Sequence, residues 1–187
     1  MRAPPAIRFS DHVVGDGPRF RAAACKAKAE GVVSKRVDAA YAPDNWGLWR
    51  KSKCLNREEF VIVGWTDPEG SRPYIGALLL GYYTDSGRLI YAGRAGGGIS
   101  EVELRRLDAK VTPLAIRTMS LPAPPPRSNR FGSPLNLAHV HWVRPELVCE
   151  VTFLSWTDDG LLRQVTYQGL REDKPAREVR RSQVPAR

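Results

Sequence analysis

Three short apolar runs, rich in β-branched and aromatic residues, follow one another in the middle of the chain. They span residues 60–65, 75–83 and 89–92, and turn-forming clusters at residues 67–70 and 85–87 separate them. Runs of this length bounded by Gly, Pro and Asp are typical of buried β-strands joined by tight turns. The 187 residues include 16 Gly and 15 Pro, more turn-forming residues than a helical bundle needs. The spacing therefore predicts an all-β arrangement for this part of the chain.

One helix interrupts the predicted strands. Ser100 and Glu103 have the spacing of a capping box, and the apolar stripe that follows them gives way to a Pro-rich stretch at residues 121–126, which is predicted to be an exposed connector. Two more strands are predicted at residues 147–156 and 162–167. Three strands, a helix and two strands form the order of a five-stranded Greek-key barrel of the OB type. The expected fold is therefore mainly β with some α.

The first 54 residues have a different pattern with fewer strands. They predict one helix, Phe20–Ala27, and two strands, Val32–Val37 and Trp49–Cys54. A segment of this size with so few elements is too small to build its own core, so we expect it to be the end of a larger domain. The expected division is a remnant of that larger domain (residues 1–54), an OB-fold domain (55–180) and a frayed tail (181–187).

The charge balance favours a polyanionic partner. Lys and Arg number 29 against 20 Asp and Glu, which gives a net charge of +9. Residues 1–53 alone carry 11 basic side chains against 5 acidic ones. A basic protein attracts nucleic acid because the bound phosphates release their counterions. Many basic proteins bind nothing specific, so the charge alone leaves nucleic acid and the absence of a specific partner equally open.

The cysteines and the hydropathy exclude several classes of protein. Cys25, Cys54 and Cys149 lie far apart without a Cys-x-x-Cys pair, so neither a disulfide framework nor a zinc ribbon is predicted. Cys25 lies beside alanines on the apolar face of the predicted helix and is expected in a core. No run approaches the roughly 18 apolar residues of a membrane-spanning helix. We therefore expect a soluble, cytoplasmic protein without a membrane partner.

Glu30, Lys51 and Lys53 form a candidate site for phosphate and metal. Glu30 directly precedes one predicted strand, and the two lysines alternate along the next strand, so that both lie on one face. A carboxylate can hold a divalent ion while lysines neutralise phosphoryl oxygens. By spacing alone, a solvated glutamate beside a basic edge strand is the favoured alternative.

His139 and His141 are separated by one residue, a spacing that can place two metal ligands on the same side of a strand. No cysteine and no third histidine lies nearby in the sequence. An ordinary polar histidine pair is therefore the favoured interpretation.

Several segments carry a resemblance to a known family. Residues 30–36 (Glu-Gly-Val-Val-Ser-Lys-Arg), 49–53 (Trp-x-Lys-x-Lys) and 170–175 (Leu-Arg-Glu-Asp-Lys-Pro) resemble, in order and separation, the last three conserved motifs of ATP-dependent DNA ligases. The likeness is closest to the ligase module of bacterial non-homologous end-joining enzymes. Later segments of that module resemble residues 91–98, 141–145 and 156–160. The resemblance implies that residues 1–54 are the end of an adenylation (nucleotidyltransferase) domain and that an OB domain follows.

The resemblance also implies roles for single residues in a complete ligase, which uses ATP (or AMP in the adenylate) and Mg²⁺ or Mn²⁺ to seal nicked or broken duplex DNA. A catalytic carboxylate, Glu30, would coordinate the metal. Two catalytic lysines, Lys51 and Lys53, would contact the α-phosphate of the nucleotide, and Lys35 is a further candidate phosphate contact. The last motif would orient the pyrophosphate leaving group through Arg171, Asp173 and Lys174.

The nucleophile of this family is missing from the 187 residues. Ligase chemistry begins when the lysine of a Lys-x-Asp-Gly motif attacks the α-phosphate of ATP, and none of the seven lysines here precedes x-Asp-Gly. We therefore expect the C-terminal portion of a ligase that cannot adenylate itself alone. Its expected partners are DNA, a separate N-terminal ligase half and the end-binding protein Ku, near the bacterial nucleoid. The alternative is a non-catalytic OB-fold module that binds DNA.

Overall fold

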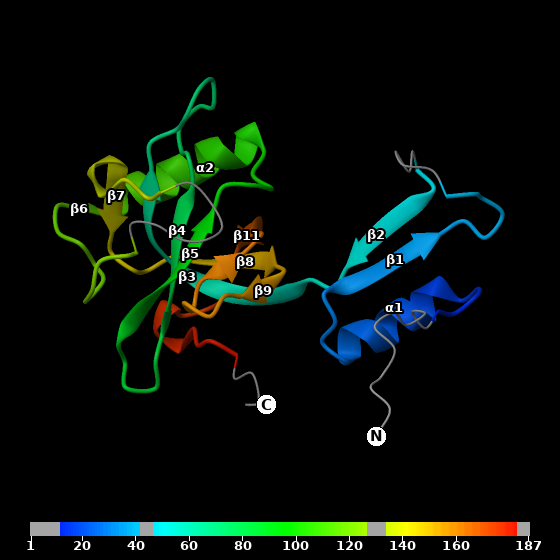
Figure 1. Ribbon diagram of the computed structural model, residues 1–187. Coiled ribbons are helices and arrows are strands. Elements are labelled where there is room, and N and C mark those ends of the chain that lie inside the picture. Colours follow the sequence, from blue (N-terminus) through cyan, green and yellow to red (C-terminus); the bar gives the residue numbers. More distant parts are fainter. Residues whose placement is uncertain (1–11, 42–46, 127–133, 183–187) are drawn as a thin grey trace. The chain divides into compact units, whose positions relative to one another are not determined.

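The computed structural model describes residues 12–41, 47–126 and 134–182. The chain divides into two compact units, residues 1–54 and residues 55–187 (Figure 1). In the described part of the chain, no helix is long and apolar enough to cross a membrane. The predicted frayed tail falls largely on residues 183–187, which lie outside the described residues.

In the described part of the first unit, residues 12–41 and 47–54, the chain forms a helix and a two-stranded antiparallel sheet (Figure 1). The helix, α1 (Gly17–Lys26), begins where Asp16 accepts a hydrogen bond from the Arg19 amide. The strands β1 (Gly31–Lys35) and β2 (Trp49–Lys53) pair over their full length. The predicted helix and both predicted strands are therefore confirmed, within a few residues at each end.

A disulfide between Cys25 and Cys54 joins the helix to the end of the sheet. The prediction of no disulfide is wrong for this pair, and so is the placement of Cys25 in a core, because its side chain is only half-buried. Twenty-nine positions separate the two cysteines in sequence, yet their Cα atoms lie 5.3 Å apart. The antiparallel return of β2 to the helix end creates this proximity, which no short-range spacing reveals.

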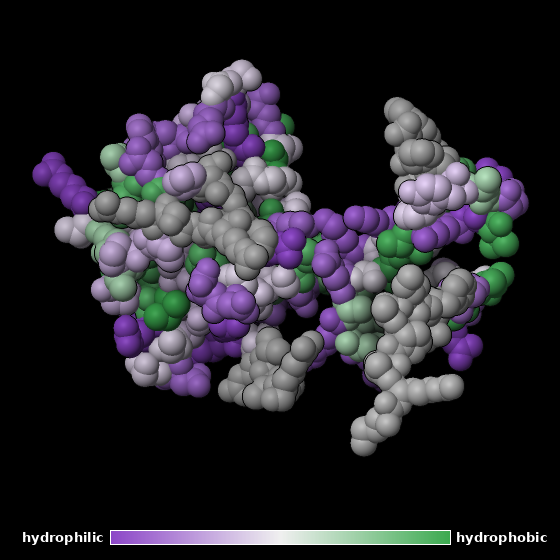
Figure 2. All heavy atoms as spheres, in the orientation of Figure 1, coloured by the Kyte–Doolittle hydropathy of each residue, from purple (hydrophilic) through white to green (hydrophobic). Residues whose placement is uncertain are grey.

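The first unit has no core of its own in its described part. None of the described residues between 12 and 54 is buried. Phe20 of α1 is 43% exposed, and Val37 and Tyr41 are about four-fifths exposed, at 82% and 79%. In Figure 2, green hydrophobic atoms are accordingly visible on the surface of this unit. Several large apolar side chains of this unit are therefore exposed to solvent.

The second unit contains the predicted five-stranded barrel. Its main path runs in the spatial order β11-β8-β3-β4-β5, and all neighbours are antiparallel. An isolated bridge between Gly97 and Thr166 links the two edges. The strands of this path are β3 (Asn56–Thr66), β4 (Leu78–Tyr83), β5 (Leu89–Ala95), β8 (Val148–Phe153) and β11 (Thr166–Leu170). The prediction of a mainly β, OB-type fold is confirmed.

Short elements extend this barrel. Two strands absent from the prediction, β6 (Ala115–Ile116) and β7 (Val140–Val143), pair with each other, and β7 also pairs with β3. The predicted strand at residues 147–156 is split into β8 and β9 (Ser155–Trp156), and the one at 162–167 into β10 (Leu162–Arg163) and β11. Three short 3₁₀ turns complete the described elements of this unit (Thr112–Leu114, Leu137–His139, Ala176–Glu178).

The helix α2 (Glu101–Val111) packs its apolar stripe into the barrel interior. Ser100 caps it by accepting the Glu103 amide at 3.3 Å. The Glu103 carboxylate accepts a hydrogen bond from the Tyr167 hydroxyl at 2.6 Å, so the reverse half of the capping box is replaced by a contact to β11. The stripe consists of three buried residues, Leu104, Leu107 and Val111.

Both faces of β3 are buried. Phe60 and Ile62 point into the interior, whereas Val61 and Val63 belong to a second apolar cluster on the outer face. The segments that cover this outer face include Leu121, Ala176 and Val179. The prediction of an exposed Pro-rich connector is therefore wrong at Leu121 and at Pro125, which are both buried. Leu121 covers valines that would otherwise face water.

Candidate functional site

The first unit presents the candidate lysines on one open face of its sheet. The register pairs Val33 with Lys51 and Lys35 with Trp49, so these side chains share a face with Lys53. The alternate positions of β2 lie on the opposite face of the sheet. Cys54 continues that face, and its disulfide bond ties it to α1. Lys51 and Lys53 are both exposed rather than packed in apolar surroundings. This face has the character expected of a phosphate-binding surface.

Glu30 lies at the end of this sheet where Lys53 also lies. Its carbonyl oxygen accepts a hydrogen bond of 2.9 Å from the Cys54 amide, next to the Gly31–Lys53 pair. Position 31 must be glycine, because a Cβ there would come within 2.5 Å of the Ser52 carbonyl oxygen. The glycine therefore permits the close approach of β1 and β2 at this end, where the Glu30 backbone lies opposite Cys54.

Lys35 lies on the lysine face of the sheet, at the end of the β1–β2 ladder that is farther from Glu30. Its ammonium nitrogen lies 3.8 Å from the centre of the Trp49 ring, a cation–π contact. The structure thus brings Glu30 and Lys53 to one end of the sheet, places Lys51 between the two ends, and sets Lys35 against an aromatic ring.

The last motif lies in the second unit, directly after β11. Arg171 continues the pairing by donating its amide to the Val148 carbonyl at 2.8 Å. Its guanidinium makes a bidentate pair with Asp173, with distances of 3.0 and 2.9 Å. This hydrogen-bonded pair lowers the pKa of the Asp173 carboxyl to about 2 and raises the pKa of the Arg171 guanidinium above its usual value.

Two glutamates that the sequence analysis missed hold the cations of this motif. The Arg171 Nη1 atom lies 2.5 Å from Glu59 Oε1, and the Lys174 ammonium lies 3.3 Å from Glu59 Oε2. The second glutamate, Glu150, is paired with Arg57 at 2.5 Å and lies 3.9 Å from Arg171. Glu150 interrupts an apolar run in the sequence, but Glu59 only precedes one, and the basic partners of both acids are distant in the chain.

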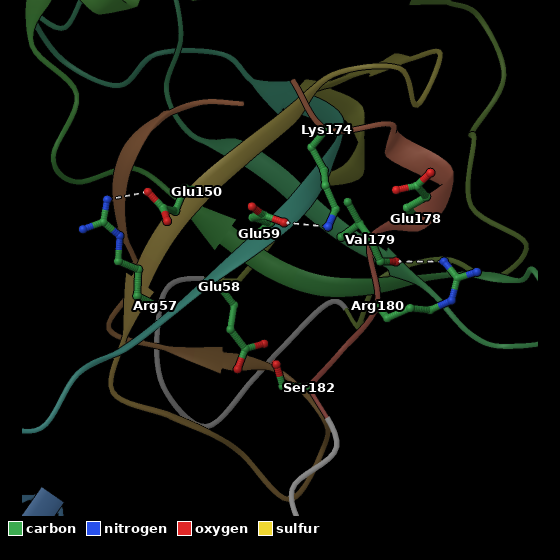
Figure 3. Close-up of a pocket in the computed structure, with 9 residues that line it drawn as sticks. All are labelled: Arg57, Glu58, Glu59, Glu150, Lys174, Glu178, Val179, Arg180 and Ser182. Carbon is green, nitrogen blue, oxygen red and sulfur yellow. Dashed lines mark hydrogen bonds and ion pairs between the residues drawn. The ribbon is translucent and has the colours of Figure 1, made fainter. Parts of the chain in front are cut away.

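Glu59, Glu150 and Lys174 line an open hollow with a volume of about 340 Å³, whereas Arg171 and Asp173 are not part of its lining (Figure 3). Burial raises the pKa of the Glu58 carboxyl above its usual value, against the opposing hydrogen bonds from Ser182. The hollow is mixed in charge, and its lining comprises Arg57, Glu58, Glu59, Glu150, Lys174, Glu178, Val179, Arg180 and Ser182.

His139 and His141 converge on a carboxylate that the sequence analysis did not name. Asp67 accepts from His139 Nδ1 at 3.0 Å through one oxygen and from His141 Nε2 at 2.6 Å through the other. These contacts lower the pKa of the Asp67 carboxyl, with His141 the larger cause. Within residues 12–41, 47–126 and 134–182, no group of three or more His, Cys, Asp or Glu is suited to a metal ion. The two histidines thus share a single carboxylate as their partner.

Comparison with known proteins places this geometry in context. A family model described as "ATP dependent DNA ligase C terminal region" matches residues 71–174. The chain is 45% identical over 175 residues to the multifunctional non-homologous end joining protein LigD of Pseudomonas aeruginosa, covering 92% of this chain and 20% of that protein. It is 41% identical over 171 residues to LigD of Mycolicibacterium smegmatis, covering 90% of this chain and 21% of that protein.

Solved structures agree with these relatives. The ligase domain of M. tuberculosis LigD superposes with a TM-score of 0.60 at 39% identity, covering 90% of this chain and 52% of that one. A mycobacterial DNA ligase D complexed with ATP and MES gives a TM-score of 0.57 at 37% identity, with the same two coverages of 90% and 52%. The chain thus spans about a fifth of its curated relatives and about half of these solved chains.

Proposed function

This chain belongs to the ATP-dependent DNA ligases, whose C-terminal region it contains, and from that premise we propose that it supplies phosphate-binding and DNA-binding groups for the sealing of DNA strand breaks. The observation that supports this most directly is the exposed lysine face of β1 and β2, with Glu30 at one end. We propose that the reaction serves break repair by end joining, as in the LigD relatives, in the cytoplasm and with the end-binding protein Ku as a partner.

We assign the nucleotide phosphates to the first unit. Lys51 and Lys53 would neutralise the α-phosphate oxygens as point charges, with Lys35 as a further contact. Glu30 would hold a divalent metal, because an exposed carboxylate is a suitable ligand for Mg²⁺ or Mn²⁺. When bound, such an ion would neutralise further phosphate charge. The exposed carboxylate and the exposed lysines fit a metal ion and a phosphate, because none of these side chains is buried among apolar residues.

We assign the pyrophosphate to the last motif. Arg171 presents a planar guanidinium, and Lys174 presents an ammonium from the same short segment. Both are suited to polyphosphate oxygens, whereas Asp173 would orient Arg171 through its bidentate pair. These groups would contact the pyrophosphate that departs, and not the atoms of the new bond between the lysine nitrogen and the α-phosphorus.

The amine that accepts the nucleotide is not among these 187 residues. In the family reaction a lysine nitrogen bonds to the α-phosphorus of ATP while the bond to the bridging oxygen breaks and pyrophosphate departs. The exposed apolar residues of the first unit, among them Phe20 and Tyr41, offer a surface for the rest of an adenylation domain. We propose that this surface binds an N-terminal ligase part that carries Lys-x-Asp-Gly, whether on the same chain or a separate one.

Complementation tests this proposal. We expect the chain to seal nicked DNA when mixed with ATP, Mg²⁺ and the N-terminal part of a LigD ligase domain that carries the lysine, and neither protein to seal alone. Lys51→Ala should lower the sealing rate at least tenfold, because a phosphate contact used in the transition state is lost. Arg50→Ala is the matched control, since Arg50 is the neighbouring exposed residue on the opposite face, and it should stay within twofold. Equal losses in both variants, or no sealing with several such N-terminal parts, would refute the proposal.

A second experiment concerns the missing nucleophile. We expect that incubation of the chain alone with ATP and Mg²⁺ or Mn²⁺ leaves its intact mass unchanged. An AMP adduct on any lysine would overturn the proposed division of labour.

The net charge of +9 favours a second candidate function, a DNA-binding OB module without catalysis. It predicts binding of any duplex sequence that weakens steeply between about 50 and 200 mM salt. Salt-steep binding combined with failure of every complementation pair would favour this module over the ligase proposal.

A further inference from the structure

Glu59 contacts both cations of the last motif with a single carboxylate. One oxygen lies 2.5 Å from the Arg171 guanidinium, and the other lies 3.3 Å from the Lys174 ammonium. Lys174 and Glu59 face each other in Figure 3. A phosphate group that engaged both cations would place its oxygens in the same two positions. The carboxylate therefore occupies the binding positions that an anionic ligand requires.

The sheet register fixes Glu59 in this place. Glu59 on β3 is directly opposite Glu150 on β8, and like charges in such a pair repel each other. Both carboxylates are mostly shielded from water, with side-chain exposures of 22% and 19%. They therefore require cations, which Arg57 and Arg171 supply.

The resulting cluster is balanced in charge. Its cations are the side chains of Arg57, Arg171 and Lys174, and three carboxylates, those of Glu59, Glu150 and Asp173, match them one for one. A polyphosphate approaching Arg171 meets these carboxylates as well as the guanidinium. As long as Glu59 stays ionised and in contact, the motif presents no net positive charge to such a ligand.

We propose that Glu59 is a positioning residue that occupies Arg171 and Lys174 as a stand-in for phosphate, and that polyphosphate must displace its carboxylate before either cation can bind it. This inference rests on the proposed function, in which these two cations bind pyrophosphate. Glu59 keeps the guanidinium and the ammonium close together while it holds their affinity for anions down. Removal of its charge with retention of its shape should therefore strengthen polyphosphate binding.

Binding of inorganic tripolyphosphate to the 187-residue chain, measured by calorimetry and by NMR shifts of the Arg171 and Lys174 side chains, tests the inference. Glu59→Gln should raise the affinity at least fivefold. Glu150→Gln should give a smaller gain, because Glu150 lies 3.9 Å from Arg171 and contacts Arg57 more closely. The conservative variant Glu59→Asp, which keeps the charge, should stay within twofold of the unsubstituted chain.

Glu172→Gln is the matched control. Glu172 lies next to Arg171 in sequence, but its carboxylate pairs with Arg106 and Lys110 of α2. It should leave the affinity within twofold, and addition of Lys174→Gln to Glu59→Gln should abolish the gain. Wild-type binding that Glu59→Gln does not strengthen would overturn this inference alone. Gains of equal size in Glu59→Gln and Glu172→Gln would also overturn it, and absence of tripolyphosphate binding in every variant would overturn both the inference and the phosphate role of the motif.

Discussion

Opening the Cys25–Cys54 disulfide should destabilise the first unit far more than the second. The disulfide closes a loop between residues 29 positions apart, and the chain-entropy relation assigns about 3.6 kcal/mol to a loop of that length. This corresponds to an increase of about 400-fold in the equilibrium constant for opening. Because no described residue of this unit is buried, little hydrophobic burial is present to compensate for the loss.

Amide hydrogen exchange measures this effect directly. We expect the amides of β1 and β2 that are protected in the oxidised protein to exchange several-hundredfold faster after reduction, or in the double variant Cys25→Ser/Cys54→Ser. The amides of β3 and β8 should keep their protection. Cys149→Ser is a suitable control variant, because Cys149 is a buried free thiol in the second unit whose pKa burial raises to about 12. Unchanged protection of β1 and β2 after reduction would refute the reasoning.

Three further predictions concern the second unit. Glu58→Gln should stabilise the protein at pH 7 but not below about pH 4. Burial raises the pKa of the Glu58 carboxyl, so the folded state loses stability as the pH rises from the unfolded pKa through the folded pKa. Urea unfolding at both pH values checks this, and a larger gain in stability at acid pH would contradict it. Ser100→Ala should cost about 1 kcal/mol in urea unfolding through loss of the α2 cap, whereas Ser86→Ala, at an exposed turn, should cost less. Leu107→Ala should cost about 2–5 kcal/mol, because Leu107 is fully buried in the barrel interior, and a thermal melt that leaves the midpoint unchanged would exclude this packing role.

Local patterns predicted the barrel because local residues determine its strands. The apolar runs that became β3, β4 and β5 are long enough to be recognised without their partners. The two strands β6 and β7 were missed because they are only 2 and 4 residues long and are defined by pairing with each other and with β3. The outer cover of β3 was missed for the same reason, since the need to bury Val61 and Val63 draws in Leu121 from far along the chain.

The candidate site was also predictable only where neighbouring residues in the sequence determine it. Alternation along β2 was enough to predict that Lys51 and Lys53 share a face, and the register agrees. Asp173, the bidentate partner of Arg171, lies in the same predicted motif, but the partner Glu59 was not predicted. Glu59 is more than 100 positions away and reaches the motif only through the pairing of β3, β8 and β11. The disulfide was missed likewise, since folding of the helix onto the sheet brings its cysteines together.

The two sets of cations that we propose bind phosphate differ in their electrostatic state, and on the proposed function this difference implies an order of events. Lys51 is exposed on an open face of the first unit, whereas Arg171 and Lys174 are already paired with carboxylates. On the proposed function, a nucleotide would gain more from Lys51 at the outset, because binding at Arg171 and Lys174 requires their ion pairs with Glu59 to be broken first. The second set, Arg171 and Lys174, would engage only when the phosphate charge is sufficient to replace Glu59, a condition that a triphosphate meets better than a monophosphate. Glu59 would then favour engagement of the motif before pyrophosphate leaves and its release afterwards, when only the adenylate phosphate remains.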